Sequence, residues 1–259
     1  MEQIWQLIQG NSPLVAAAIH DGHMLRPEVA EIMSLSDAER LREEDPFTAS
    51  WTSITDNQLI GTHSRFEVDL NRPREKAVYI QPEDAWGLQV WKETPPSKIV
   101  NQSLVNYDAF YEEAHRLFTE LENQFGHFVV FDLHSYNHRR DGTDGAPADP
   151  EANPEVNFGT GTLNREHWGS IVESFIGDLS AFNFLGRQLD VRENIKFRGG
   201  QLGRWTHEHF PNSGCALSIE FKKFFMNEWT GIPDETQVEA IRQGLQSTIP
   251  GILQILKKN

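Results

Sequence analysis

The chain of 259 residues contains a single cysteine, Cys215. One cysteine excludes an intrachain disulfide, and it also excludes the structural zinc sites that are built from several thiolates. A metal ion bound by this protein would therefore have to be held by imidazole and carboxylate groups.

Long apolar segments are also missing. The longest apolar run extends from Leu14 to Ile19, and a helix needs roughly 20 apolar residues to cross a bilayer. The N-terminal region has no basic segment leading into a long apolar stretch, so no secretory signal is predicted. We therefore expect a cytoplasmic protein with no membrane partner.

Positive charge is scarce. The chain has 23 lysines and arginines against 38 aspartates and glutamates, which gives a formal net charge of −15. Nucleic acids and anionic lipids bind proteins through basic surfaces, so neither is an expected partner. Local clusters of basic residues are more informative against this acidic background than they would be in a basic protein. Composition does not indicate an oligomeric state.

The apolar pattern predicts a single α/β domain over residues 1–259, with a central mixed, mostly parallel sheet flanked by helices. Strands are predicted at residues 14–19, 65–70, 127–134 and 215–221. Helices are predicted at residues 36–42, 107–125, 168–179 and 238–253, and the second of these is expected to be capped by Asn106 and to stop at Gly126. Residues 139–154 are rich in Asp, Gly and Pro, which is typical of a surface loop and a candidate lid.

Three predicted strands end in side chains that can bind a metal or move a proton. His20 and His23 follow the first strand, His134 ends the third, and Glu220 lies in the fourth. The carboxyl ends of parallel strands meet at one edge of a sheet, which is where ligands bind in such folds. A catalytic zinc takes three protein ligands and one water. We therefore expect one Zn²⁺ on His20, on His134 and on either Asp45 or His23.

Other residues near these strands fit a hydrolytic site. Glu220 has apolar neighbours, which suits a general base with a perturbed pKa. Asp132 lies two residues before His134, so it could orient the imidazole. Arg65, Asn71 and Arg72 form a polar group that suits a substrate carboxylate or an oxyanion.

The motifs Asp69-Leu70-Asn71-Arg72 and Asp132-Leu133-His134-Ser135, with a histidine at one strand end and a glutamate in a later strand, resemble those of zinc carboxypeptidases and aspartoacylases. The segments Thr62-His63-Ser64-Arg65 and Phe197-Arg198-Gly199-Gly200 make the sequence most similar to the N-formylglutamate amidohydrolase family, over about residues 12 to 230. This combination of motifs is far more specific than any one of them.

The resemblance implies one zinc ion, a metal-activated water and Glu220 as base and proton shuttle. It also implies that Asn71 and Arg72 hold a substrate carboxylate, that Arg65 polarises the scissile carbonyl and that Arg204 contacts the distal carboxylate.

The third metal ligand stays open. Carboxypeptidase-like relatives have a glutamate ligand three residues after the first histidine, where this chain has His23. Formylglutamate hydrolases have a later acidic pair, which Glu44-Asp45 resembles.

The expected function is therefore metal-dependent hydrolysis of the amide of a small N-formyl or N-acyl amino acid, with N-formyl-L-glutamate giving formate and L-glutamate. One alternative is a carboxypeptidase or a deacylase acting on larger N-acyl amino acids, and another is a non-catalytic binding protein of the same fold. The acidic loop from Asp141 to Asp149 matches no known role.

Overall fold

A seven-stranded sheet in the order β1-β3-β2-β4-β7-β5-β6 forms the centre of the molecule. The structure is a computed structural model and describes residues 3–258. β3, β2, β4 and β7 are parallel neighbours, whereas β1 and β5 each pair antiparallel with the adjacent strand, and β6 is parallel to β5. The predicted fold, a mixed and mostly parallel sheet, is confirmed. The strands are β1 Trp5–Ile8, β2 Leu14–Ala18, β3 Asn57–Gly61, β4 Phe128–Tyr136, β5 Val156–Gly159, β6 Val191–Glu193 and β7 Gly214–Lys222.

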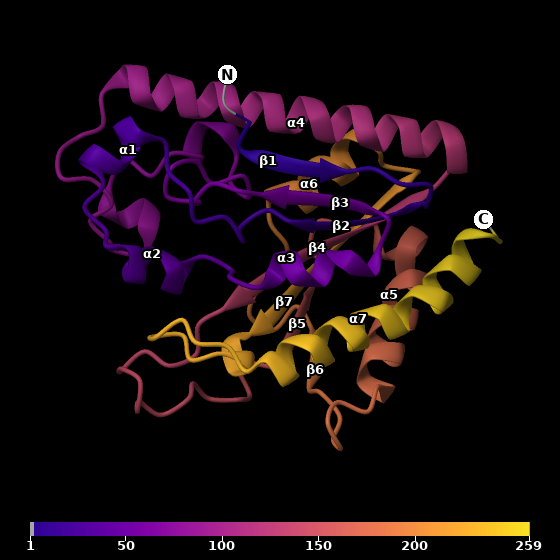
Figure 1. Cartoon of the computed structure of the whole chain (residues 1–259). Helices are drawn as coiled ribbons and strands as arrows, with labels where there is room; N and C mark the ends of the chain where they lie inside the picture. The colour runs from indigo at the N-terminus through magenta and orange to yellow at the C-terminus, as the bar shows by residue number, and fades with distance from the viewer. Residues whose placement is uncertain (1–2, 259) are drawn as a thin grey trace.

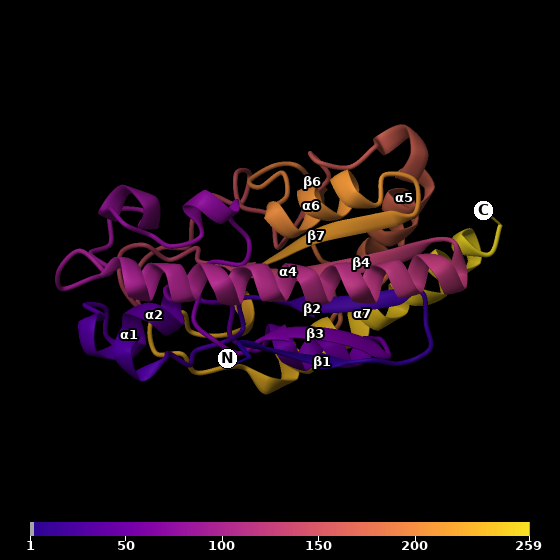
Figure 2. The same ribbon diagram turned by 90° about the horizontal axis from the view of Figure 1, so that it is seen from above.

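Helices cover both faces of the sheet, as Figures 1 and 2 show. α4 (Ser97–Phe125) and α6 (Gln201–His209) pack on one face, and α3 (Thr48–Trp51), α5 (Arg165–Ala181) and α7 (Glu235–Leu256) pack on the other. α1 (Pro27–Ile32) and α2 (Asp37–Glu43) lie beyond one end of the sheet. Short 3₁₀ helices cover Thr52–Ile54, Arg74–Lys76, Pro82–Ala85 and Lys223–Phe225. Within residues 3–258, no helix has the length and apolar character needed to span a bilayer.

The strands that carry the candidate residues form where the sequence predicts them. β2, β4 and β7 correspond to the predicted strands at 14–19, 127–134 and 215–221, and they are adjacent and parallel. Their register pairs His134 with Glu220, so these two side chains lie side by side on the same face of the sheet. The parallel arrangement therefore brings the ends of the three strands to one edge.

The predicted strand at residues 65–70 is wrong. Phe66, Val68 and Leu70 are buried as the alternation requires, but Glu67 and Asp69 between them are also fully buried. Local turns satisfy the backbone here, since the Glu67 amide donates to the carbonyl of Ser64 (2.9 Å). The alternating pattern thus belongs to a loop that is buried on both sides. The strand in this region is β3, which starts eight residues before the predicted strand.

The helix predicted at residues 107–125 ends as expected but starts earlier. Gly126 stops it with a positive φ of 78°, a conformation that glycine adopts without strain. Its first residue is Ser97 and its N-cap is Pro96, so the predicted cap at Asn106 is wrong. The extra turns pack Ile99 and Val100 against a separate small core, and Leu104 contacts both this core and the one that residues 107–125 contact.

A buried ion pair holds the loop at residues 62–76 in place. The Arg26 backbone amide and Nε donate to the two carboxylate oxygens of Glu67 at 2.8 and 2.7 Å, and Arg26 Nη2 donates to the Ser103 hydroxyl at 2.7 Å. Glu67 is fully buried and Arg26 is 4% exposed. The pair links the start of α1 to α4 through the loop that carries Arg65 and Asn71.

We expect Glu67→Ala to lower the free energy of unfolding by about 3–5 kcal/mol, because it leaves the Arg26 guanidinium buried without its counter-charge. Chemical denaturation measures the change. Glu28→Ala is the matched control, since Glu28 contacts the same arginine at 3.2 Å but is exposed, and its loss should cost less than about 1 kcal/mol. Equal effects of the two substitutions would show that burial does not strengthen the pair.

Candidate metal and hydrolytic site

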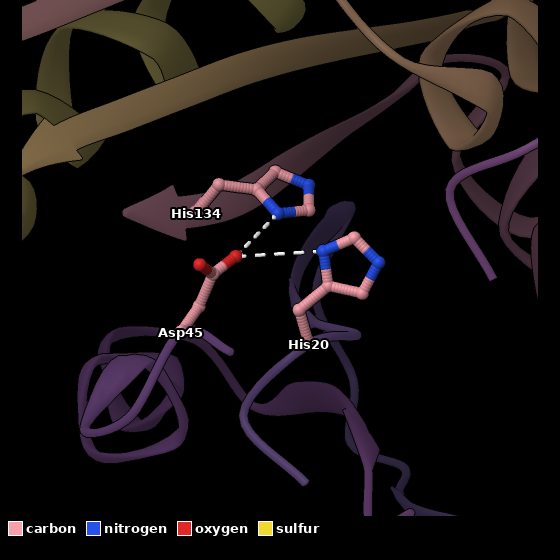
Figure 3. Close-up of side chains that lie close together, drawn as sticks. All are labelled: His20, Asp45 and His134. Carbon is pink, nitrogen blue, oxygen red and sulfur yellow. Dashed lines mark hydrogen bonds and ion pairs between the residues drawn. The ribbon is translucent and has the colours of Figure 1, made fainter. Parts of the chain in front are cut away.

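Two histidines and one aspartate meet at the edge of the sheet. His20 follows β2, His134 lies near the end of β4, and Asp45 follows α2. Oδ2 of Asp45 is 3.0 Å from His134 Nδ1 and 3.5 Å from His20 Nδ1 (Figure 3). All three side chains are buried, and one ligand atom from each lies within 4.8 Å of the others.

These three residues fit a metal ion. Ligand atoms around a tetrahedral zinc at about 2.1 Å are roughly 3.4 Å apart, which is close to the distances seen here. In the described part of the chain, the buried His20 Nδ1 has no hydrogen-bond partner, although burying such an atom without a partner is costly. Two imidazoles and one carboxylate are a usual donor set for catalytic zinc.

A carboxylate behind each histidine fixes its orientation. His20 Nε2 is 2.7 Å from Asp69 Oδ1, and His134 Nε2 is 2.9 Å from Asp132 Oδ1. Each carboxylate accepts the proton of Nε2, which leaves the Nδ1 lone pair of each ring available to a metal ion that Asp45 would share. The contact between Asp132 and His134 was expected from the sequence, whereas the contact between Asp69 and His20 was not.

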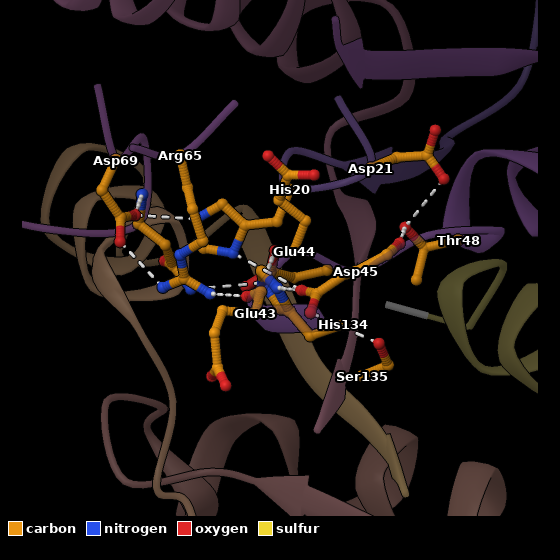
Figure 4. Close-up of polar contacts among 12 residues, drawn as sticks. His20, Asp21, Glu43, Glu44, Asp45, Thr48, Arg65, Asp69, His134 and Ser135 are labelled. Atoms are coloured by element: carbon orange, nitrogen blue, oxygen red, sulfur yellow. Dashed lines mark hydrogen bonds and ion pairs between the residues drawn. The ribbon is translucent and has the colours of Figure 1, made fainter. Parts of the chain in front are cut away.

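Asp69 also positions the arginine of the site. Arg65 Nη2 donates to Asp69 Oδ2 at 2.8 Å (Figure 4). The Tyr79 hydroxyl donates to the same oxygen. Burial alone would raise the pKa of Asp69, but the charges of Arg65 and His20 hold this pKa well below its ordinary value. The Asp69 carboxylate therefore stays ionised and keeps Arg65 at the wall of the site.

Asp45 is held from behind by a lysine. Lys223 is 1% exposed, and its Nζ donates to the carbonyl oxygens of Arg42 and Glu44, both at 2.6 Å. These carbonyls belong to the segment that immediately precedes Asp45. Burial would raise the pKa of Asp45, but the adjacent imidazoles of His134 and His20 hold this pKa below its ordinary value. Asp45 is thus an ionised carboxylate on a fixed segment.

His23 lies outside this cluster. Its Nδ1 is 2.5 Å from Glu44 Oε2, and its side chain is 38% exposed. Of the two residues that the sequence left open as the third ligand, the structure brings Asp45 and not His23 to His20 and His134.

Glu220 lies next to His134 in the register of β4 and β7 and lines the same cavity. Burial raises the pKa of the Glu220 carboxyl to about 7, although the nearby His134 opposes the shift. A carboxyl group with a pKa near neutrality can both accept and release a proton at physiological pH.

A cavity of about 860 Å³ opens over the cluster. Arg65, Asn71, Arg72 and Arg204 all line it, together with His20, Asp45, His134 and Glu220. Its wall is strongly basic despite the acidic composition of the chain. The lysines and arginines that line it are Arg65, Arg72, Lys76, Arg140, Lys196, Arg198, Arg204 and Lys223.

Asn71 connects the metal cluster to α6. Its Oδ1 accepts the Leu202 amide (3.0 Å), which caps the start of the helix, and its Nδ2 is 3.2 Å from His134 Nε2. Gly200 permits this contact, because a Cβ there would lie 2.2–2.4 Å from the Asn71 amide. Arg72 is 35% exposed and Arg204 is exposed at the cavity mouth, so both are accessible to a ligand.

Sequence reasoning missed Trp86 and Lys223. Trp86 lines the cavity and packs its ring 5.1 Å from the Arg65 guanidinium carbon. Its φ of 56° is left-handed, which is rare for a bulky residue and marks a position held by its surroundings. No sequence pattern marks Trp86. Lys223 could have been found from the sequence, because it lies three residues after Glu220, directly after β7.

The comparisons with known proteins agree with this geometry. A family model described as N-formylglutamate amidohydrolase matches residues 12–226. The fold is similar to that of an N-formylglutamate amidohydrolase from Ralstonia eutropha JMP134, with a TM-score of 0.72, 15% identity, and coverage of 98% of this chain and 97% of the other. A gene product of Agrobacterium tumefaciens aligns with a TM-score of 0.67, 13% identity, and coverage of 98% and 96%.

None of the curated proteins compared matches the sequence. At such low identity the two structures demonstrate a shared fold only, whereas the family model extends over most of the chain, including the segments that carry His20, Asp45, His134 and Glu220. The chain belongs to the N-formylglutamate amidohydrolase family.

Proposed function

We propose that this protein is a zinc-dependent amidohydrolase that removes the formyl group from N-formyl-L-glutamate. One observation carries the proposal: His20, His134 and Asp45 direct donor atoms to one point, next to Glu220, inside a cavity with a basic wall. The family to which the chain belongs supports the same activity.

His20, Asp45 and His134 would hold the zinc ion, and Asp69 and Asp132 keep the two imidazoles in the orientation that this requires. Bound zinc lowers the pKa of a coordinated water from 15.7 to about 7 and polarises a carbonyl group. His23 has no part in this proposal, because its ring nitrogen is engaged with Glu44.

Glu220 acts as the base. Its carboxylate accepts a proton from the attacking water as the water oxygen bonds to the formyl carbon, and it then delivers this proton to the amide nitrogen as the carbon–nitrogen bond breaks. The products are formate and L-glutamate. The raised pKa of Glu220 suits both transfers, because the group must gain and lose the proton within one turnover.

The arginines bind and orient the substrate. Arg65, fixed by Asp69 at 2.8 Å, stabilises negative charge that develops on the carbonyl oxygen. Arg72 with Asn71 holds one substrate carboxylate, and Arg204 holds the distal carboxylate. Donors fixed in this way hold the amide bond of the bound substrate in one position, which favours the reaction.

Purified without chelator, the protein should contain about one zinc per chain and release formate from N-formyl-L-glutamate. Elemental analysis and a formate assay make the two measurements. Zinc without turnover on this compound would refute the assigned substrate. If the protein bound no metal after reconstitution but still bound the ligand, it would be a non-catalytic binding protein of the same fold and not an enzyme.

Asp45→Ala should weaken zinc binding strongly, whereas His23→Ala should not. Loss of a residue that only supports a ligand already costs about 10–100-fold in metal affinity, so we expect at least 100-fold weaker binding for Asp45→Ala. Competition with a chromogenic chelator gives the zinc affinity of both variants. The reverse order of effects would make His23 the third ligand.

Glu220→Gln should retain zinc and lose about 10²–10⁴-fold in kcat, because the amide cannot accept the proton of the attacking water. Glu43→Gln is the matched control: Glu43 lines the same cavity but its carboxylate is paired with Arg42 at 2.7 Å. Formate release and zinc content are measured for both. Retained turnover in Glu220→Gln would rule out this residue as the base.

A further inference from the structure

The arginines of this chain fall into two groups. Most of them lie within 4.0 Å of a carboxylate, as expected for a protein with excess acidic residues. Counting contacts within residues 3–258, those with no such partner are Arg139, Arg140, Arg198 and Arg204. The last three line the cavity over the candidate metal cluster. Unpaired guanidinium groups are therefore concentrated at the site.

The fixed backbone around Arg198 holds this residue in place. Asn157 is fully buried on β5; its Oδ1 accepts the Lys196 amide at 2.7 Å and its Nδ2 donates to the Phe197 carbonyl at 2.8 Å. These two bonds anchor the segment immediately before Arg198. The side chain itself is exposed and is therefore free to bind a ligand.

The backbone near Arg140 is anchored in a similar way. The carboxylate of Glu228, 2% exposed, accepts the amides of His138 and Arg139 at 2.7 and 2.8 Å. Arg140 is exposed and follows directly. Both arginines thus extend from backbone held by a buried polar side chain, an arrangement that lowers the entropy lost when a ligand binds.

The proposed substrate does not use these two groups. N-formyl-L-glutamate has two carboxylates, which Arg72 and Arg204 satisfy. It has about twelve non-hydrogen atoms, whereas a cavity of about 860 Å³ is of the size that encloses drug-sized ligands. Like charges that gather in one cavity repel each other and raise the affinity for an anion. The cavity therefore has volume and unpaired positive charge that N-formyl-L-glutamate does not use and that a larger, more acidic compound would use.

We propose that Arg140 and Arg198 form an outer anion subsite that binds a third carboxylate of the substrate. The preferred substrate class is then an N-acyl acidic compound with one more carboxylate than N-formyl-L-glutamate. That carboxylate comes either from a second acidic residue joined to the glutamate or from a dicarboxylic acyl group. The inference rests on the proposed amidohydrolase function and names the substrate class of the same site.

The test compares matched substrates that differ by one charge. N-formyl-L-glutamyl-L-glutamate is compared with N-formyl-L-glutamyl-L-glutamine, and N-succinyl-L-glutamate with N-butanoyl-L-glutamate. We expect kcat/KM to be at least 10-fold higher for the acidic member of one pair, and the pair that shows the preference identifies the source of the carboxylate. Equal values within both pairs would overturn the proposal.

The double variant Arg140→Gln/Arg198→Gln should abolish this preference, so the ratio of kcat/KM within the responding pair should fall to about 1. The ratio cancels any effect of the substitutions on turnover common to both substrates. Arg242→Gln is the control for lost positive charge, because Arg242 lies on α7, paired with Glu239 at 2.7 Å. The proposed subsite would be wrong if the double variant kept the preference for the acidic substrate. It would also be wrong if Arg242→Gln removed this preference to the same extent as the double variant.

Calorimetry separates failure of the subsite from failure of the proposed function. L-glutamyl-L-glutamate and L-glutamyl-L-glutamine are titrated into the zinc-loaded protein and into the double variant, with succinate against butanoate as the second pair. Tighter binding of an acidic member, lost in the double variant, supports the subsite even if no N-acyl compound is cleaved. If the protein cleaved N-formyl-L-glutamate but bound both members of each pair equally, the proposed function would be supported and the proposed subsite would be wrong.

Discussion

The buried carboxylate of Asp69 connects the parts of the site. It contacts His20 at 2.7 Å and Arg65 at 2.8 Å, and it accepts the hydroxyl of Tyr79 and the backbone amide of Asn71. An isolated carboxylate at this depth would be costly, so its four donors must all be in place for the fold to tolerate it. This requirement fixes the imidazole of His20, the guanidinium of Arg65 and the loop that carries Asn71 relative to each other.

The sheet sets the other half of the geometry. Because β2, β4 and β7 are parallel neighbours, His20, His134 and Glu220 emerge at one edge from three distant parts of the chain. Asp45 joins them through α2, where Lys223 on the adjoining segment after β7 holds the carbonyls of the preceding residues. The sheet therefore carries the imidazoles and Glu220, and buried polar contacts position the groups that arrive on loops.

The charge distribution links this site to the choice of substrate. A chain with a net charge of −15 has carboxylates available for nearly every arginine, yet Arg140, Arg198 and Arg204 meet no carboxylate partner within residues 3–258 and all face one cavity. An anion of matching shape would satisfy them. The proposed substrate N-formyl-L-glutamate has two carboxylates, and the unpaired arginines would bind the proposed third.

The sequence by itself determined the α/β class and the strands β2, β4 and β7, because continuous apolar runs report burial directly. It also predicted that the polar ends of these strands meet at one edge of the sheet, whereas the register that pairs His134 with Glu220 came from the structure. It could not decide between Asp45 and His23, since both follow the first strand at plausible spacing and only the path of α2 places one beside His134. It also misassigned residues 65–70, because Glu67 and Asp69 are buried as ion pairs, the first with Arg26 from a distant part of the sequence and the second with Arg65. Apolar residues in the local pattern indicate which side chains are buried, whereas a charged side chain such as Glu67 can be buried only where tertiary contacts supply its partner.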